Sequence, residues 1–147
     1  MSHSKRGKST KAHPTIKPIK DDVDISVDAL TQYAEEHPVF SFEHLCENFL
    51  RPSKESPDFF QDFVKRLHKL GELGWKQIRT SDRHSFGMEK IPVAQMFPQM
   101  PCCVTEDVTE LSVFRADGAN RVFAGFMRDK IFFVLFIESN FGDLYNH

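Results

Sequence analysis

The chain has 147 residues, with 19 Lys and Arg against 21 Asp and Glu, so its formal net charge is −2. This length fits one domain whose core is large enough to fold without disulfides. The near-neutral charge argues against a general nucleic-acid binder, because such domains are usually clearly basic. Any site for a polyanion must therefore be a local patch.

The chain has three cysteines, Cys46, Cys102 and Cys103, and they show no C-x-x-C spacing. We therefore expect a reduced, cytoplasmic protein with no structural zinc, no other metal and no cofactor. The N-terminus has no apolar signal-peptide core, and no apolar stretch approaches about 20 residues. The sequence predicts neither a transmembrane helix nor a membrane partner.

Residues 1–22 are rich in Ser, Lys, His and Pro, and residues 1–20 carry six Lys and Arg and no acid. With almost nothing to bury, this segment is predicted to be a disordered basic tail. A basic arm can contact RNA, but a solvated tail has the same composition. The predicted folded unit is a single α+β domain over residues 26–147.

Three helices are predicted in the first half of the chain. The first covers Ser26 to Glu36, and the second opens at Ser41 and ends at Arg51-Pro52. The third runs from Pro57 to about Ile78, with Ser56 as its cap and Pro57 at its first position. An apolar stripe follows at helical spacing, and Gly71 and Gly74 predict a kink or a close approach near the end of this helix.

Strands are predicted in the second half. Met88 to Met96 is a plausible strand, and residues 111–147 contain three apolar runs separated by two turns. The first turn, Ala116 to Asn120, offers Gly118 for a positive φ, and the second is the three-residue turn Arg128 to Lys130. The apolar run Ile131 to Ile137 predicts a central strand that is buried on both faces. Helices followed by strands predict an α+β fold, in which N-terminal helices pack on a small, mostly antiparallel sheet.

The segment from Arg83 to Glu89 is the first candidate site. It places Arg83, His84 and Glu89 within seven residues between the long helix and the sheet. An imidazole exchanges protons near neutral pH, a carboxylate can act as a base, and a guanidinium can neutralise a phosphate. A polar loop that caps the C-terminus of the helix would use the same residue types.

Arg115 and Arg121 flank the first turn and are expected to lie roughly opposite each other. Two guanidinium groups so placed repel unless an anion or a carboxylate lies between them. The alternative is that each pairs with a nearby acid, namely Asp117, Asp129 or Glu138.

Tyr145 and His147 are two residues apart, so in an extended chain their side chains project from the same face. A strand that continued to this point would hold both of them in place. A frayed tail is the alternative.

A wider pattern joins these residues. It comprises a long helix faced by Lys and Arg, a loop with Arg83, His84 and Glu89, strands that carry scattered arginines, and a final Tyr-x-His at 145–147. Over about residues 57–147 this pattern resembles the RelE/ParE superfamily of bacterial toxins, of the YoeB/HigB mRNA-interferase type.

The resemblance implies the toxin of a toxin–antitoxin pair, a metal-independent endoribonuclease whose partners are an antitoxin protein and mRNA, free or on the ribosome. His84 or Glu89 would be the base, Arg115 and Arg121 would hold the phosphate, and Tyr145 or His147 would be the acid or an orienting group. Three further side chains would bind substrate: Arg83, Lys76 and Arg128. Seven of these side chains are expected to converge on one concave surface: Arg83, His84, Glu89, Arg115, Arg121, Tyr145 and His147.

The alternative is a non-catalytic protein-interaction or RNA-binding module on the same scaffold. Arginines gathered around Tyr145 and His147 would favour catalysis. Arginines that are paired with carboxylates would favour the module. If Arg115 and Arg121 lay on opposite faces of the sheet, the interferase interpretation would fail and the module would take its place.

Overall fold

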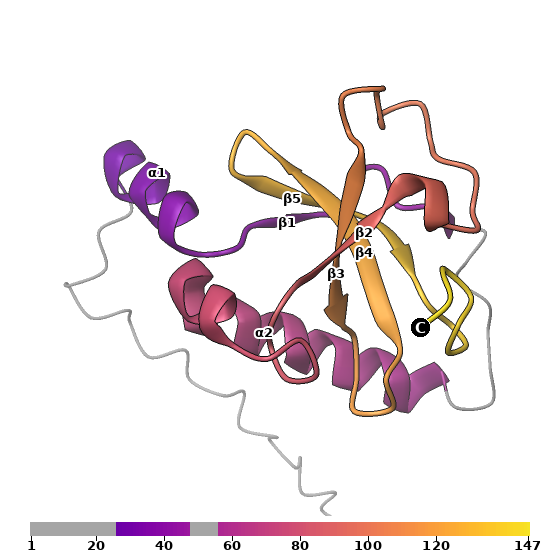
Figure 1. Ribbon diagram of the computed structural model, residues 1–147. Helices are drawn as coiled ribbons and strands as arrows, with labels where there is room; N and C mark the ends of the chain where they lie inside the picture. Colours follow the sequence, from indigo (N-terminus) through magenta and orange to yellow (C-terminus); the bar gives the residue numbers. More distant parts are fainter. Residues whose placement is uncertain (1–25, 48–55) are drawn as a thin grey trace, which may run out of the picture.

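The structure is a computed structural model that describes residues 26–47 and 56–147, and Figure 1 shows its arrangement. The predicted basic tail lies outside the described residues. The described part forms an α+β fold with two α-helices, α1 (Val27–Glu36) and α2 (Ser56–Thr80), and one five-stranded sheet. No helix in this part of the chain is both long and apolar enough to cross a membrane.

The sheet has the order β1-β5-β4-β3-β2 and is mostly antiparallel. Its strands are β1 (Phe40–Ser41), β2 (Glu89–Pro92), β3 (Glu110–Arg115), β4 (Val122–Arg128) and β5 (Ile131–Ile137). Only β1, which pairs with β5, is parallel among these described strands. The predicted run of three consecutive strands is confirmed, and β5 lies inside the sheet.

Helix α2 crosses one face of the sheet (Figure 1) and supplies one half of the core. Phe59, Phe63, Leu70, Trp75 and Ile78 are all at most 4% exposed. The predicted kink falls at Gly74, whose φ is 77°. A Cβ there would lie 2.9 Å from the carbonyl oxygen of Glu36, so the glycine lets the end of α1 approach.

The predicted first helix forms as α1, and it begins after Ser26, whose hydroxyl accepts from the Ala29 N–H. None of its residues is buried. The helix is held to α2 by His37, whose Nδ1 lies 2.7 Å from the Gly71 carbonyl oxygen and whose ring stacks on Tyr33.

The predicted helix from Ser41 is wrong over the described residues. Phe40 and Ser41 form β1, and the Cys46 N–H donates to the Leu135 carbonyl of β5. Phe40 lies edge-on to the core rings Phe114, Phe123 and Phe132. Packing against the sheet therefore overrode an apolar spacing that also fits a helix, and residues 48–52 of that prediction lie outside the described part.

Both predicted hairpins form, with different turn geometry. The β4–β5 turn has two residues, Asp129 (φ 50°) and Lys130 (φ 68°), which is the positive-φ pair of a type I′ turn. In the β3–β4 loop the positive φ belongs to Asn120, at 70°, and not to Gly118. Asparagine tolerates this conformation better than other residues with a Cβ.

The sheet has a second apolar face, opposite α2. Residues from β2 to β5 on this face pack with Met96, Leu144 and Tyr145. The segment after β2, which includes the short 3-10 helix η2 (Val93–Gln95), and the segment after β5 thus cover this face, and neither described α-helix does. This second layer, which the sequence did not predict, carries the candidate site.

Candidate functional site

A cavity of about 210 Å³ lies on the face of the sheet opposite α2. Its lining side chains are Arg83, His84, Glu89, Ile91, Gln95, Arg115, Tyr145, Asn146 and His147. The structure therefore brings together six of the seven residues that were expected to converge. Because drug-sized ligands occupy about 300–1,000 Å³, a cavity of this size suits one small group, such as a phosphate with part of its sugar.

Strand pairing explains the convergence. Glu89 on β2 pairs with Val113 on β3, and Val113 packs in the second apolar face. Side chains alternate along a strand, so Arg115 shares that face with Val113. The turn before β2 adds Arg83 and His84, and it is fixed by the His84 N–H, which donates to Asp82 Oδ1 at 2.7 Å.

The two arginines of the cavity have different partners. Arg83 Nη1 donates to Glu89 Oε1 at 3.0 Å. Arg115 Nη1 donates to the backbone and side-chain oxygens of Asn120, at 3.0 and 2.8 Å. Among the described residues no carboxylate lies within ion-pair distance of Arg115, so its charge is available to an anion.

His84 lies between the two guanidinium groups. Its Nδ1 is 2.8 Å from Arg115 Nη2, and its Nε2 is 3.3 Å from Arg83 Nε. Each guanidinium can only donate, and a neutral imidazole has one unprotonated nitrogen, so His84 accepts from one of the two arginines at a time. The shorter contact favours Nδ1 as the acceptor, from Arg115.

Tyr145 and His147 form one wall. Their rings stack with centroids 4.2 Å apart, although they lie in a loop after β5 and not in the strand that would have held them on one face. Burial, and after it the negative charges of Glu89 and Glu138, raise the pKa of Tyr145 to about 12. The phenol therefore keeps its proton and stays neutral at physiological pH.

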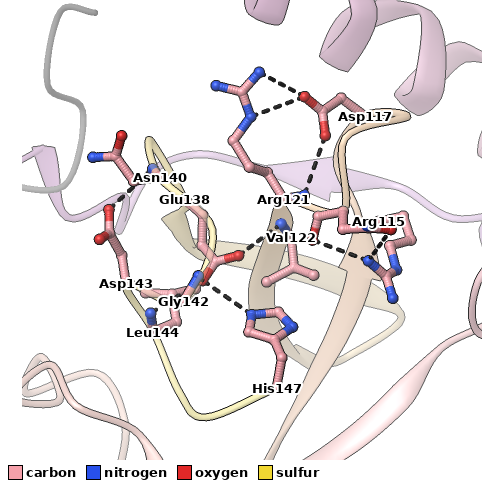
Figure 2. Close-up of polar contacts among 11 residues, drawn as sticks. Arg115, Asp117, Arg121, Val122, Glu138, Asn140, Gly142, Asp143, Leu144 and His147 are labelled. Carbon is pink, nitrogen blue, oxygen red and sulfur yellow. Dashed lines mark hydrogen bonds and ion pairs between the residues drawn. The ribbon is translucent and has the colours of Figure 1, made fainter.

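Glu138, which follows β5, organises this wall (Figure 2). Its side chain is fully buried. Oε1 accepts from the Val122 N–H at 3.0 Å, and Oε2 accepts from the N–H groups of Gly142 and Leu144, both at 3.1 Å. Oε2 also lies 3.3 Å from His147 Nε2. One carboxylate thus joins β4, the last loop and His147.

Sequence reasoning named Glu138 only as a possible partner of the arginines. The signal that was available is its place directly after an apolar strand, where an acid is unexpected inside a core.

Arg121 does not join the cavity, so the expectation that it holds a phosphate beside Arg115 is wrong. Its guanidinium pairs with Asp117, with Nη2 at 2.7 Å and Nε at 2.9 Å from Oδ2, and it lies 4.1 Å from the centroid of Phe59 on α2. Figure 2 shows Arg121 turned to Asp117 and away from Arg115.

The physical reason is the register of the hairpin. Arg115 pairs with Val122 and not with Arg121, and a shift of one residue moves a side chain to the other face. Arg115 and Arg121 therefore lie on opposite faces of the sheet.

Lys76 and Arg128, the other predicted substrate-binding residues, also lie elsewhere. Lys76 lines a larger hollow of about 510 Å³ between the end of α1 and the kink of α2. Arg128 Nη2 lies 3.5 Å from Asp107 Oδ2 and donates to the Thr105 hydroxyl at 3.3 Å. Neither residue contributes to the cavity.

The described residues include no group of three or more His, Cys, Asp or Glu side chains arranged to hold a metal ion. The three cysteines are free thiols, and burial raises the pKa of Cys46 and Cys103.

No protein-family model, no curated protein and no solved structure matches the chain.

Proposed function

We propose that the protein is a metal-independent endoribonuclease whose active site is the cavity between β2, β3 and the last loop. One observation carries the proposal: Arg83, His84, Glu89, Arg115, Tyr145 and His147 line a single small cavity although they come from distant parts of the chain. Cleavage of RNA without a metal needs a cation for the phosphate, a base and an acid. This set supplies all three.

The groups have distinct tasks in the proposed reaction. Arg115, which has no carboxylate partner among the described residues, neutralises the scissile phosphate, and Arg83 lies beside it. His147 donates through Nε2 to Glu138, which leaves Nδ1 to take the proton of the ribose 2′-hydroxyl. The 2′-oxygen then bonds to phosphorus, the bond from phosphorus to the 5′-oxygen breaks, and the neutral Tyr145 phenol protonates the leaving oxygen. The products are a 2′,3′-cyclic phosphate and a 5′-hydroxyl.

Three arginines support the second candidate, a non-catalytic interaction module. Arg83, Arg121 and Arg128 each pair with a carboxylate, and Arg121 lies on the face away from Arg115. This arrangement contradicts the interferase interpretation in the form that the sequence suggested, in which Arg115 and Arg121 both hold the phosphate, so the proposed enzyme relies on Arg115 without Arg121. Such pairing is what a stable scaffold requires. Enzyme and module differ in what happens to RNA at the cavity: the enzyme cleaves it, and the module does not.

The test is cleavage of single-stranded RNA by the purified protein in the presence of a chelator. We expect products with 2′,3′-cyclic phosphate ends and no cleavage of the 2′-deoxy analogue. Arg115→Ala should lower the cleavage rate by about 100-fold, as is typical when a group that stabilises developing charge is removed. Arg128→Ala, an arginine outside the cavity, is the matched control and should cleave like the parent. An intact parent that leaves RNA uncut would favour the module.

We further propose that this activity is that of a cytoplasmic toxin of the RelE/ParE type, which is held inactive by an antitoxin. The support is the arrangement of Arg115, Tyr145 and His147 around one cavity. Inducing the parent in cells should arrest growth with cleavage of mRNA, and inducing Arg115→Ala should not. A short DNA-binding antitoxin encoded by the neighbouring gene should relieve the arrest.

A further inference from the structure

A ladder of three aromatic rings leads out of the cavity. The ring of His147 lies between two others, with centroids 4.2 Å from Tyr145 and 4.2 Å from Phe141. Exposure rises along the ladder, because the Tyr145 residue is 5% exposed and Phe141 is 57% exposed. The ladder thus begins in the cavity and ends with a ring in solvent.

Phe141 is held by an ordered turn. The Asn140 N–H donates to Asp143 Oδ2 at 3.1 Å, and the Asp143 N–H donates back to the Asn140 carbonyl at 3.2 Å (Figure 2). Gly142, with φ 90°, donates its N–H to the buried Glu138. The loop therefore presents an apolar ring to water in a fixed place, at a hydrophobic cost that a bound group would remove.

We propose that Phe141 is a stacking platform for an unpaired nucleobase of single-stranded RNA, next to the nucleotide whose phosphate enters the cavity. This inference rests on the proposed function and names a substrate contact that it does not include. His147 is common to the ladder and the cavity, so a base on Phe141 lies beside the phosphate site. In the part of the chain that the structure describes, no carboxylate pairs with the nearby guanidinium of Arg115, so it can bind the anionic backbone of the same strand.

A base is the occupant that this geometry fits. The exposed ring of Phe141 offers one small, flat apolar face next to a cationic cavity. This combination suits a flat group that is attached to a phosphate. Stacking a base on an aromatic side chain is tolerant of sequence, since every base has a π-face. We therefore expect the platform to add affinity with little discrimination among bases.

The experiment measures stacking without cleavage. The probe is a single-stranded 2′-O-methyl oligonucleotide that carries one fluorescent 2-aminopurine base. Because its 2′-oxygens are methylated, the probe lacks the attacking 2′-hydroxyl and is not cleaved. We expect the protein to quench the fluorescence of the probe, and Phe141→Ala to weaken binding by about 10-fold or more. Phe141→Trp should restore both. Phe97→Ala is the matched control, because Phe97 is 59% exposed and lies outside the ladder; it should bind like the parent.

The outcomes separate this inference from the proposed activity. If the parent cleaves RNA but Phe141→Ala binds and quenches the probe like the parent, the platform is refuted and the endoribonuclease stands. If quenching depends on Phe141 but no RNA is cleaved, the platform stands on a binding module. If Phe97→Ala loses as much affinity as Phe141→Ala, exposed apolar area binds the probe non-specifically, and the platform is refuted.

Discussion

At the scale of single residues, the candidate site depends on a buried acid that contacts backbone more than side chains. Glu138 accepts from Val122 on β4 and from Gly142 and Leu144 in the last loop, and it fixes His147. Residue types alone pointed to His147 and Tyr145, because both can move protons. They could not point to Glu138, whose importance comes from three N–H groups that are visible only once the chain has folded.

Glu138→Ala should therefore destabilise the protein more than the replacement of an exposed Asp or Glu by Ala. The buried N–H groups of Val122 and Leu144 and the half-buried N–H of Gly142 lose their acceptor. One unsatisfied buried group costs about 1–3 kcal/mol, so we expect a loss of about 3 kcal/mol or more. Urea denaturation measures this, and hydrogen exchange should show faster exchange at Leu144. Glu110→Ala, at an exposed acid on β3, is the control. A loss below about 1 kcal/mol would contradict the role of Glu138.

Tyr145 should lose its proton at a higher pH than an ordinary tyrosine does. Its pKa is raised from 10.0 to about 12, first by burial. Because the folded pKa is the higher one, the stability that Tyr145 contributes is complete below pH 10.0 and is lost as the pH rises toward about 12. In a Tyr33→Phe background, the ultraviolet absorbance of phenolate should show a midpoint near 12, well above that of the unfolded chain. A midpoint near 10.0 would mean that Tyr145 is not enclosed by the cavity.

At the scale of elements, residues that mark the start of a helix predicted α1 and α2 correctly, but they failed where long-range packing decides the structure. The Ser26 cap and the Ser56-Pro57 start act locally, and both helices were predicted. Ser41 gave a similar signal, but Phe40 and Ser41 pair with β5. Long-range packing against β5 determined the conformation of that segment, and a local sequence pattern carries no information about such packing.

The β4–β5 pair contains an irregularity that the sequence did not predict. Ala124 pairs with Phe136 and Gly125 with Val134, so Leu135 is an extra residue on β5. A Cβ at Gly125 would lie 1.9 Å from the Phe133 carbonyl oxygen. The strands can approach here only because residue 125 has no side chain.

Gly125→Ala should consequently lose about 3 kcal/mol of stability or fail to fold, since the clashing atom belongs to the backbone of a central strand. Gly118→Ala is the matched control, because a Cβ there meets nothing within 4 Å. It should change the free energy of unfolding by no more than about 0.5 kcal/mol. Equal stability of the two variants would show that the strands are not so close at Gly125.

At the scale of the whole molecule, the sheet separates a structural face from the candidate functional face. Helix α2 and the pair of Arg121 and Asp117 belong to one face, and the cavity with Arg115 belongs to the other. The fold class, the three consecutive strands and most cavity residues could be predicted, because they follow from periodicity and residue type. The division of Arg115 from Arg121 could not, because it depends on hairpin register.

The most direct test of this account compares Arg115→Ala with Arg121→Ala in two assays, RNA cleavage per folded molecule and the free energy of unfolding. Arg115→Ala should lose about 100-fold in cleavage with little change in stability. Arg121→Ala should cleave nearly like the parent but lose about 3 kcal/mol, because it leaves the buried Asp117 without its cation. The account would be contradicted if Arg121→Ala abolished cleavage while keeping its stability, or if Arg115→Ala cleaved as fast as the parent.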